Sequence, residues 1–331
     1  MNAPHTEEEL EALLAQPYPE DRAALAPLTG NLILLGAGGK MGPSLARRAR
    51  LAAPPALNII AVSRSRVDVP GVESISADLL ERGTLDQLPD ADHVIYLAAR
   101  KFGTAEDSSA TWATNSALPG LVAQRFANSR IISWSTGNVY PLTPIASGGA
   151  TEQTPLAPIG EYGQSALARE RVFDYFSRRN ATPLCFLRLN YAVDLRYGVL
   201  VDLAQRVLRN EPIDLSMGHV NVIWQGDANS ICLRSFALCS SPPRALNVTG
   251  LATLSVRDLA TRFARAFDTS VEFDKTESPD ALLSNAAACA ELFGPPRVSV
   301  DQLIDWVAHW VRDVKVFLNK PTHFEVRDGQ F

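Results

Sequence analysis

Several features that would assign the chain to a simple functional class are missing from its 331 residues. The four cysteines (Cys185, Cys232, Cys239 and Cys289) form no C-x-x-C pair, so we predict buried, reduced thiols. The five histidines show no metal-ligand spacing, so no metal site is expected. A net charge of -5 argues against a broad phosphate-binding surface, so nucleic acid is not an expected partner.

Long apolar runs are also missing. None reaches the roughly 18 residues that a membrane-spanning helix needs, and acidic residues stand where a secretory signal would carry basic ones. We therefore expect a cytoplasmic protein with no membrane partner. Lysine is scarce, occurring only at positions 40, 101, 275, 315 and 320, which limits the ammonium groups available to any site.

What is present is a regular alternation of short apolar runs and helical patterns. The segments 31–35, 57–62, 72–77, 93–99, 130–135 and 185–190 read as buried strands. Between them, residues 42–50, 79–88, 108–127 and 162–179 read as helices. This order predicts an α/β fold, a Rossmann-type doubly wound parallel sheet with right-handed crossovers, over residues 31–190.

Two further regions flank this predicted domain. Residues 1–30 form an N-terminal extension, in which Thr6 and Glu9 make a capping box ahead of a short amphipathic helix expected on the outside of the sheet. Residues 191–331 are predicted to form a smaller, helix-rich lobe for the substrate. Its expected helices span 198–209, 226–239, 255–267, 280–292 and 300–312, and its charged tail is expected to be solvated.

A glycine-rich turn follows the first predicted strand directly. The sequence LLGAGGKMG places Gly36, Gly39 and Gly42 between strand and helix, the context in which a dinucleotide pyrophosphate is bound. Gly38, Lys40 and Met41 complete this predicted coenzyme-binding turn. The spacing is G-x-x-G-x-x-G and not G-x-G-x-x-G, so an ordinary glycine-rich turn remains an alternative. A P-loop is excluded because no Ser or Thr follows Lys40.

The end of the second strand indicates which coenzyme is bound. A carboxylate there accepts the ribose 2'-hydroxyl of NAD, whereas this chain has Ser63, Arg64 and Arg66. Guanidinium groups pair well with a 2'-phosphate, so NADP is favoured, with NAD as the alternative coenzyme. The alternative is that Arg64 and Arg66 are solvated surface residues that bind no coenzyme.

More segments match one family pattern. Asp78-Leu79 follows the third strand, Leu97-Ala98-Ala99 the fourth, and Asn115 lies in the next helix. SWSTGNVYP then places Thr136, and EYGQSALARE places Tyr162. With the glycine turn, the chain resembles the extended short-chain dehydrogenase/reductase family, which includes nucleotide-sugar epimerases and dehydratases. The resemblance covers residues 31 to about 312 and implies that these positions bind the coenzyme or the substrate oxygen.

The resemblance implies that Tyr162 relays a proton and that Thr136 holds the substrate oxygen. The simpler alternatives are that Tyr162 packs at the start of its helix and that Thr136 provides a turn hydroxyl. One departure stands out: the family's lysine, four residues after the tyrosine, is Ala166 here. A tyrosine relay needs a nearby cation that stabilises its phenolate. We predict that Lys101, or else Arg100, supplies that charge, with a solvated loop lysine as the alternative.

Substrate residues are less defined. Asn190 and Tyr191 lie in R-L-N-Y, one residue short of the family's R-x-x-N segment, and Trp224 lies in a polar and aromatic stretch with Gln225 and Asp227. The predicted substrate-binding set is Arg100, Asn138, Asn190, Tyr191 and Trp224.

Three functions remain open from the sequence. They are an NAD(P)-dependent oxidoreductase, epimerase or dehydratase acting on a sugar or sugar-acid-like small molecule, a weakly active NADP-binding sensor, and a simple NADPH-dependent carbonyl reductase. The family commonly pairs the two helices that correspond to 108–127 and 162–179 with their symmetry mates, so a homodimer is expected.

Overall fold

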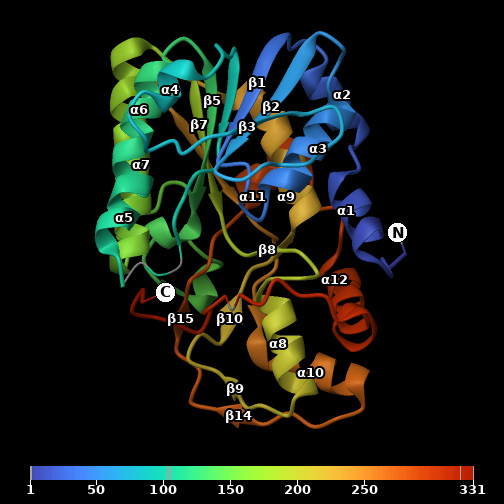
Figure 1. Cartoon of the computed structure of the whole chain (residues 1–331). Coiled ribbons are helices and arrows are strands. Elements are labelled where there is room, and N and C mark those ends of the chain that lie inside the picture. Colours follow the sequence, from blue (N-terminus) through green and yellow to red (C-terminus); the bar gives the residue numbers. More distant parts are fainter. Residues whose placement is uncertain (1, 102, 104–105, 321, 331) are drawn as a thin grey trace.

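The computed structural model describes residues 2–101, 103, 106–320 and 322–330, and its centre is a seven-stranded sheet (Figure 1). All six strand pairings are parallel, in the order β12-β7-β5-β4-β1-β2-β3. The strands are β1 (Gly30–Leu35), β2 (Leu57–Ser63), β3 (Glu73–Ser76), β4 (His93–Tyr96), β5 (Arg130–Thr136), β7 (Leu184–Leu189) and β12 (Arg244–Val248). The order reverses between β1 and β4, where doubly wound sheets bind their ligands. The predicted Rossmann-type sheet is confirmed.

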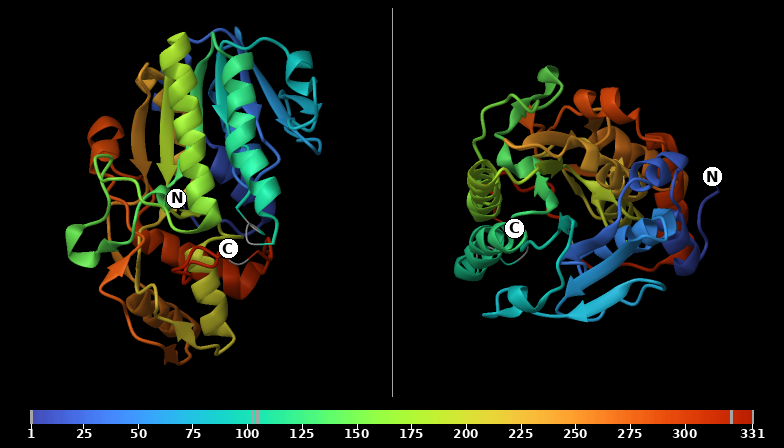
Figure 2. Two further views of the ribbon diagram at one scale, coloured as in Figure 1. Left: turned by 90° about the vertical axis from the view of Figure 1, so that its left-hand side faces the viewer. Right: turned by 90° about the horizontal axis from the view of Figure 1, so that it is seen from above.

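Helices cover both faces of the sheet. On one face lie α4 (Thr84–Gln87), α5 (Ser108–Trp112), α6 (Leu118–Arg125) and α7 (Gly160–Asn180), with α6 and α7 side by side (Figure 2). On the other lie α3 (Gly42–Ala52), α9 (Gln225–Arg234) and α11 (Ala287–Phe293), with α2 (Pro19–Leu25) outside them. Each helix buries its apolar side against the sheet, which explains why six of the seven strands could be recognised as apolar runs.

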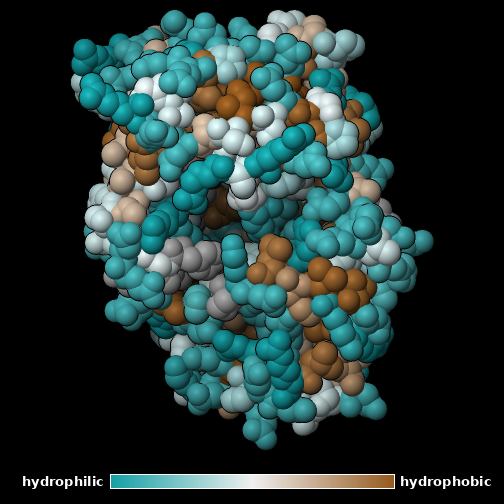
Figure 3. Space-filling model, viewed as in Figure 1, coloured by the Kyte–Doolittle hydropathy of each residue, from teal (hydrophilic) through white to brown (hydrophobic). Residues whose placement is uncertain are grey.

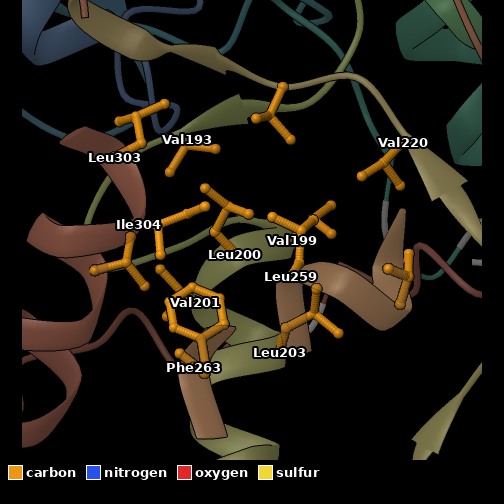
Figure 4. Packing of buried hydrophobic residues seen from close by; sticks show 14 of the residues in the cluster. Val193, Val199, Leu200, Val201, Leu203, Val220, Leu259, Phe263, Leu303 and Ile304 are labelled. Carbon is orange, nitrogen blue, oxygen red and sulfur yellow. The ribbon is translucent and has the colours of Figure 1, made fainter. Parts of the chain in front are cut away.

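A smaller lobe lies below the carboxyl ends of the strands in Figure 1. Its helices α8 (Val199–Leu208), α10 (Val256–Phe267) and α12 (Val300–His309) pack around Leu200, Leu259 and Phe263 (Figure 4). Four short strand pairs complete the described structure: β8 (Ala192–Val193) with β11 (Ile223–Trp224), β9 (Ile213–Asp214) with β14 (Phe273–Asp274), β10 (His219–Val220) with β13 (Leu254–Ser255), and β6 (Thr143–Pro144) with β15 (Asp280–Ala281).

The two units do not separate at residue 190 as the sequence suggested. Strand β12 pairs with β7, and helices α9 and α11 cover the sheet, although all three follow that residue. The chain therefore enters the lobe, returns to the sheet and leaves again. Two predicted helices are also shorter than expected: 79–88 is helical only over Thr84–Gln87, after Gly83 at φ 81°, and 280–292 only from Ala287.

Helix α1 (Glu7–Ala15) begins where the capping box predicted, because the Thr6 hydroxyl accepts a hydrogen bond from the Glu9 N–H at 3.2 Å. Its position differs from the prediction. Leu10 and Leu14 belong to the core of the smaller lobe, and the helix contacts α3 and α9 instead of the sheet. The helix therefore connects the two units. None of the described helices is long and apolar enough to cross a lipid bilayer.

Candidate active site

The glycine turn after β1 has the geometry that a diphosphate requires. Gly36 adopts φ 88°, and a Cβ there would lie 2.5 Å from the Ala98 nitrogen. A Cβ on Gly42 would collide with the Ala37 carbonyl oxygen, so this glycine lets α3 start close to the strand. Above Gly39 the nearest atom is the Gly36 oxygen at 3.6 Å, which leaves that face open to a ligand. The turn fits a nicotinamide coenzyme at the N-terminus of α3.

The loop after β4 lies directly beside this turn. The Leu97 N–H donates to the Leu35 carbonyl at 2.8 Å, and Ala98 packs against Gly36, while Ala99 is exposed. The Asn115 side chain clamps the next residue, since it accepts from the Arg100 N–H at 2.8 Å and donates to the Arg100 carbonyl at 2.9 Å. Asn115 lies in a π-helical segment (Ala113–Ala117) between α5 and α6 and is fully buried. It therefore fixes the backbone that leads to Lys101.

The residues expected around the adenosine half lie at the ends of β2 and β3. The Ser63 hydroxyl lies 3.0 Å from the position that a Gly38 Cβ would take. Arg64 and Arg66 are both exposed, and no ion pair with a described residue occupies either guanidinium. Asp78 accepts a hydrogen bond from the Leu80 N–H at 3.0 Å, and Leu79 is buried.

Thr136 and the first turn of α7 meet at the same edge. The Thr136 hydroxyl accepts hydrogen bonds from the Asn138 N–H at 3.2 Å and from its side-chain amide at 3.0 Å. Gly163 packs against the Asn138 backbone so closely that a Cβ would lie 2.7 Å from its carbonyl oxygen. Tyr162, 8% exposed, is the residue before that contact. The structure thus brings the two residues that the sequence paired to the edge that carries the glycine turn.

A buried ion pair supports this region from beneath. Glu170 and Arg188 lie 2.6 Å apart, and Glu170 also accepts from the Ser135 hydroxyl at 2.5 Å. Arg188 donates to the Tyr140 hydroxyl at 2.7 Å. Burial opposes the charge of Arg188, but the hydrogen bond and field of Glu170 raise its pKa. Apart from the glutamate in EYGQSALARE, no sequence pattern indicated this pairing.

The position of the missing lysine is closed. Ala166 is fully buried against Val139, Tyr140 and Ala150, so no ammonium group reaches Tyr162 from this turn of α7. Of the two predicted substitutes, Arg100 lies 3.6 Å from the Asp107 carboxylate and is 37% exposed, which directs its charge to the surface. Lys101 is held inside, with its Nζ 3.4 Å from the Thr322 carbonyl oxygen. Burial lowers the pKa of Lys101 to about 8, opposed by Asp202.

Lys40 is a second ammonium group in the same region. Its Nζ donates to the Ala192 carbonyl at 2.7 Å and lies 4.7 Å from the centre of the Tyr197 ring. Burial is the main cause that lowers the pKa of Lys40 to about 8; Asp194 opposes this shift, and Arg196 and Lys101 contribute to it. Burial and the nearby Asp202 and Tyr162 raise the pKa of Tyr197. From the sequence, Lys40 was predicted only as part of the coenzyme-binding turn, and these contacts with Ala192 and Tyr197 were not expected.

The predicted substrate residues divide into two groups. Asn138 lines a small open pocket with Ile159, Met217 and Leu282, next to Thr136. Tyr191 adopts φ 46°. Burial, Glu325 and Tyr197 raise the pKa of Tyr191, and Tyr197 is the residue whose ring Lys40 contacts.

Asn190 and Trp224 are packing residues instead. Asn190 is 2% exposed and donates to the Leu282 carbonyl at 3.3 Å. Trp224 is 1% exposed and packs edge-to-face on Trp306, with ring centres 5.4 Å apart. Its placement in the core contradicts a substrate contact, because the indole presents almost no surface to a ligand. The other residues of that stretch have structural partners: Gln225 donates to the Ser44 hydroxyl at 3.0 Å, and Asp227 accepts from the Tyr18 hydroxyl at 2.8 Å.

The surface is hollowed between the sheet-bearing unit and the smaller lobe (Figure 3). The hollow lies below the carboxyl ends of the strands as they are seen in Figure 1. It therefore faces the crevice between β1 and β4, where the glycine turn and the loop leading to Lys101 emerge.

Comparison with known proteins relates the first part of the chain to a family. Residues 32–194, just under half of the chain, match the NAD dependent epimerase/dehydratase family. The predicted Rossmann-type fold is confirmed, and the match agrees with the predicted resemblance to short-chain dehydrogenases/reductases over this segment. No curated protein matches the sequence closely enough to be called a relative.

Three solved structures share the fold across most of the chain. UDP-glucose 4-epimerase from Thermotoga maritima, with UDP-glucose, has a TM-score of 0.72 at 16% identity, covering 86% of this chain and 99% of that one. MoeE5 in complex with UDP-glucose and NAD has a TM-score of 0.71 at 19% identity, with coverage of 86% and 99%. UDP-glucuronic acid 4-epimerase from Bacillus cereus, with UDP-glucuronic acid and NAD, has a TM-score of 0.71 at 16% identity, with coverage of 86% and 100%.

Proposed function

We propose that this protein is an NADP-linked oxidoreductase, epimerase or dehydratase that acts on a hydroxyl or carbonyl carbon of a sugar or sugar-acid-like compound. The observation that carries the proposal is the packing of the first turn of α7 against the loop after Thr136, at the edge that bears the glycine turn. Two solved structures with the same fold contain a UDP-sugar and NAD, which supports the sugar class and a nicotinamide coenzyme.

The chain's own groups then have distinct roles. Bound NADP would supply hydride exchange at the substrate carbon. The Thr136 hydroxyl would donate a hydrogen bond to the substrate oxygen, and Tyr162 would transfer a proton to or from that same oxygen. Because Ala166 cannot supply a charge, the Lys101 ammonium would stabilise the phenolate form of Tyr162. Lys40, one residue after Gly39, would lie beside the coenzyme phosphates.

A second candidate function rests on Ala166. A binding protein that senses NADP would keep the glycine turn and lose the catalytic lysine, as this chain has. Coenzyme binding without turnover on sugar and carbonyl panels would favour the sensor. Net NADPH consumption with a carbonyl compound would favour a simple reductase, and coenzyme that stays bound through purification would favour an epimerase or dehydratase, in which hydride leaves and returns.

The choice of NADP can be tested at the end of β2. Arg64→Ala and Arg66→Ala should each weaken NADP binding about tenfold to a hundredfold, because a hydrogen bond to a charged group contributes about 1.5–3 kcal/mol. NAD, which has no 2'-phosphate, should bind these variants and the unmodified protein equally. Calorimetric titration measures both affinities. Arg209→Ala, an exposed arginine of the smaller lobe, is the control, and equal losses for NAD and NADP would exclude recognition of the 2'-phosphate.

The role of Lys101 predicts a pH dependence. An ammonium group is present below its pKa and lost above it, so kcat/KM of the unmodified enzyme should fall as pH rises through about 8, the pKa that burial gives Lys101. Lys101→Met should be slower at neutral pH and should lack this fall. Lys315→Met, at an exposed position, should keep the original profile. An unchanged profile in Lys101→Met would remove Lys101 from the mechanism.

We also propose a homodimer formed through α5, α6 and α7. Trp112, Leu121 and Tyr175 on these helices are 37%, 48% and 55% exposed, and apolar groups gathered on one surface are typical of an interface. Leu121→Arg combined with Tyr175→Arg should convert the dimer to a monomer, which light scattering detects. Leu51→Arg, on α3, is equally exposed but lies outside this surface and should leave the mass unchanged. A monomeric unmodified protein would contradict the proposal.

A further inference from the structure

The charged tail, residues 320–331, was expected to be solvated, and the structure contradicts this for the residues that it describes. The C-terminal segment consists of residues 316–320 and 322–330. The Leu318 N–H donates to the Arg196 carbonyl at 3.1 Å, and Phe324, 1% exposed, belongs to the core of the smaller lobe. Arg327 pairs with Asp280 at 2.5 Å. Gly329 then packs against Gly160, two residues before Tyr162. The segment thus runs across the middle of the molecule to the start of α7 (Figure 1).

Thr322 is the point at which this segment meets Lys101. Its N–H and hydroxyl both donate to the Asp202 carboxylate, at 2.8 Å and 2.5 Å. Its carbonyl oxygen accepts from the Lys101 Nζ at 3.4 Å. Thr322 is 2% exposed. Because the peptide unit of a buried residue with two such bonds has little freedom, its carbonyl gives the long lysine side chain a fixed direction.

We propose that Asp202 and Thr322 are positioning residues that hold the Lys101 ammonium at the reacting edge of the cleft. This inference rests on the function proposed above for Lys101. In the family pattern the lysine projects from α7 itself, one helical turn beyond the tyrosine. Here the ammonium comes from the loop after β4 and needs a support from elsewhere, which α8 and the C-terminal segment provide.

Electrostatics agrees with this arrangement. Burial raises the pKa of Asp202, although both hydrogen bonds from Thr322 lower it, so Thr322 favours the ionised carboxylate. That carboxylate in turn opposes the effect of burial on the pKa of Lys101. Other charged or titratable groups interact with Lys101, with Asp202 or with their neighbours. They are Lys40 from the glycine turn, Tyr162 from α7, Arg206 from α8, Glu325 from the C-terminal segment, and Tyr191, Asp194, Arg196 and Tyr197 from the segment before α8.

The test follows Lys101 directly and needs no substrate. With only five lysines in the chain, NMR of protein labelled at the lysine side chains can follow each amine through a pH titration, and Lys101→Met identifies the signal. Asp202→Asn should lower the Lys101 pKa by about 1 unit or more, since a neighbouring opposite charge is lost. Thr322→Val should lower it in the same direction, and Thr322→Ser, which keeps the hydroxyl, should restore it.

Asp280→Asn is the matched control, because it loosens the same segment at Arg327 without touching Asp202. A Lys101 pKa unchanged in Asp202→Asn, or an equal shift in Asp280→Asn, would overturn the positioning role. The pH profile of kcat/KM should follow the NMR pKa in each variant. If the pKa of Lys101 shifts as expected while Lys101→Met leaves the pH profile of kcat/KM unchanged, the proposed catalytic role of Lys101 fails. The support of Lys101 by Asp202 and Thr322 would then be confirmed on its own.

Discussion

Tyr162→Phe is expected to lower kcat about 10²- to 10⁴-fold, the range that a positioned general acid or base contributes. The substitution removes only the phenolic oxygen and keeps a ring that is 8% exposed, so the fold and the packing of α7 on Asn138 should persist. Coenzyme affinity should therefore stay within a few-fold of the original. Turnover on an active compound from the sugar and carbonyl panels measures the first effect, and calorimetry with NADPH the second.

Tyr175→Phe is the control, because it removes the same phenolic oxygen about 20 Å further along α7. It should leave both quantities unchanged. Turnover by Tyr162→Phe at the original rate would mean that the tyrosine transfers no proton. A large loss of coenzyme affinity with kcat preserved would make Tyr162 a binding residue, and the reaction would then need a different acid or base.

Local sequence was sufficient to identify the sheet and the coenzyme turn. A strand that is buried on both faces is apolar along its whole length, so β1, β2 and β5 stand out without any knowledge of their neighbours. The glycine turn is recognisable from local sequence because it stands between a strand and a helix. The requirement at Gly42 comes from Ala37 in the same turn, whereas the one at Gly36 comes from Ala98 after β4. Family resemblance then predicted that Thr136 and Tyr162 share one edge.

Features that depend on contacts between distant segments were not predictable. Thr322 contacts Lys101 across 221 positions, and Tyr18 contacts Asp227 across 209. Nothing in a charged C-terminal sequence distinguishes a solvated tail from one that donates to a buried carboxylate. The pattern LVDLAQRVL contained a usable signal: Asp202 lies among the apolar residues of α8, and an acid in that place needs a partner.

Trp224 shows why composition misled the search for substrate residues. An aromatic residue beside polar ones suggests a pocket, but here the indole packs on Trp306 while its polar neighbour Gln225 joins α9 to Ser44 of α3. The first contact lies in the core of the smaller lobe, and the second joins two helices that cover the sheet. The residues of R-L-N-Y also have structural partners. Arg188 on β7 pairs with Glu170 on α7, and Asn190 donates to a backbone carbonyl.

Gly39→Val is expected to weaken coenzyme binding about fivefold to a hundredfold or more while leaving the free protein folded. The nearest atom to a Cβ at this position is 3.6 Å away, so the free turn has room for a Cβ. In the complex it would occupy the space through which the pyrophosphate approaches the backbone, and such overpacking costs about 1–3 kcal/mol or more. Thermal melting of the free protein and calorimetry with NADPH separate the two effects.

Gly36→Ala provides the contrasting variant in the same turn. Gly36 has φ 88°, and its Cβ would lie 2.5 Å from the Ala98 nitrogen, so this change should lower the melting temperature even without coenzyme. The two glycines thereby test different requirements, one imposed by the ligand and one by the fold. Full coenzyme affinity in Gly39→Val would show that no diphosphate contacts this turn, and the assignments of Thr136, Tyr162 and Lys101 to a nicotinamide reaction would then lose their basis.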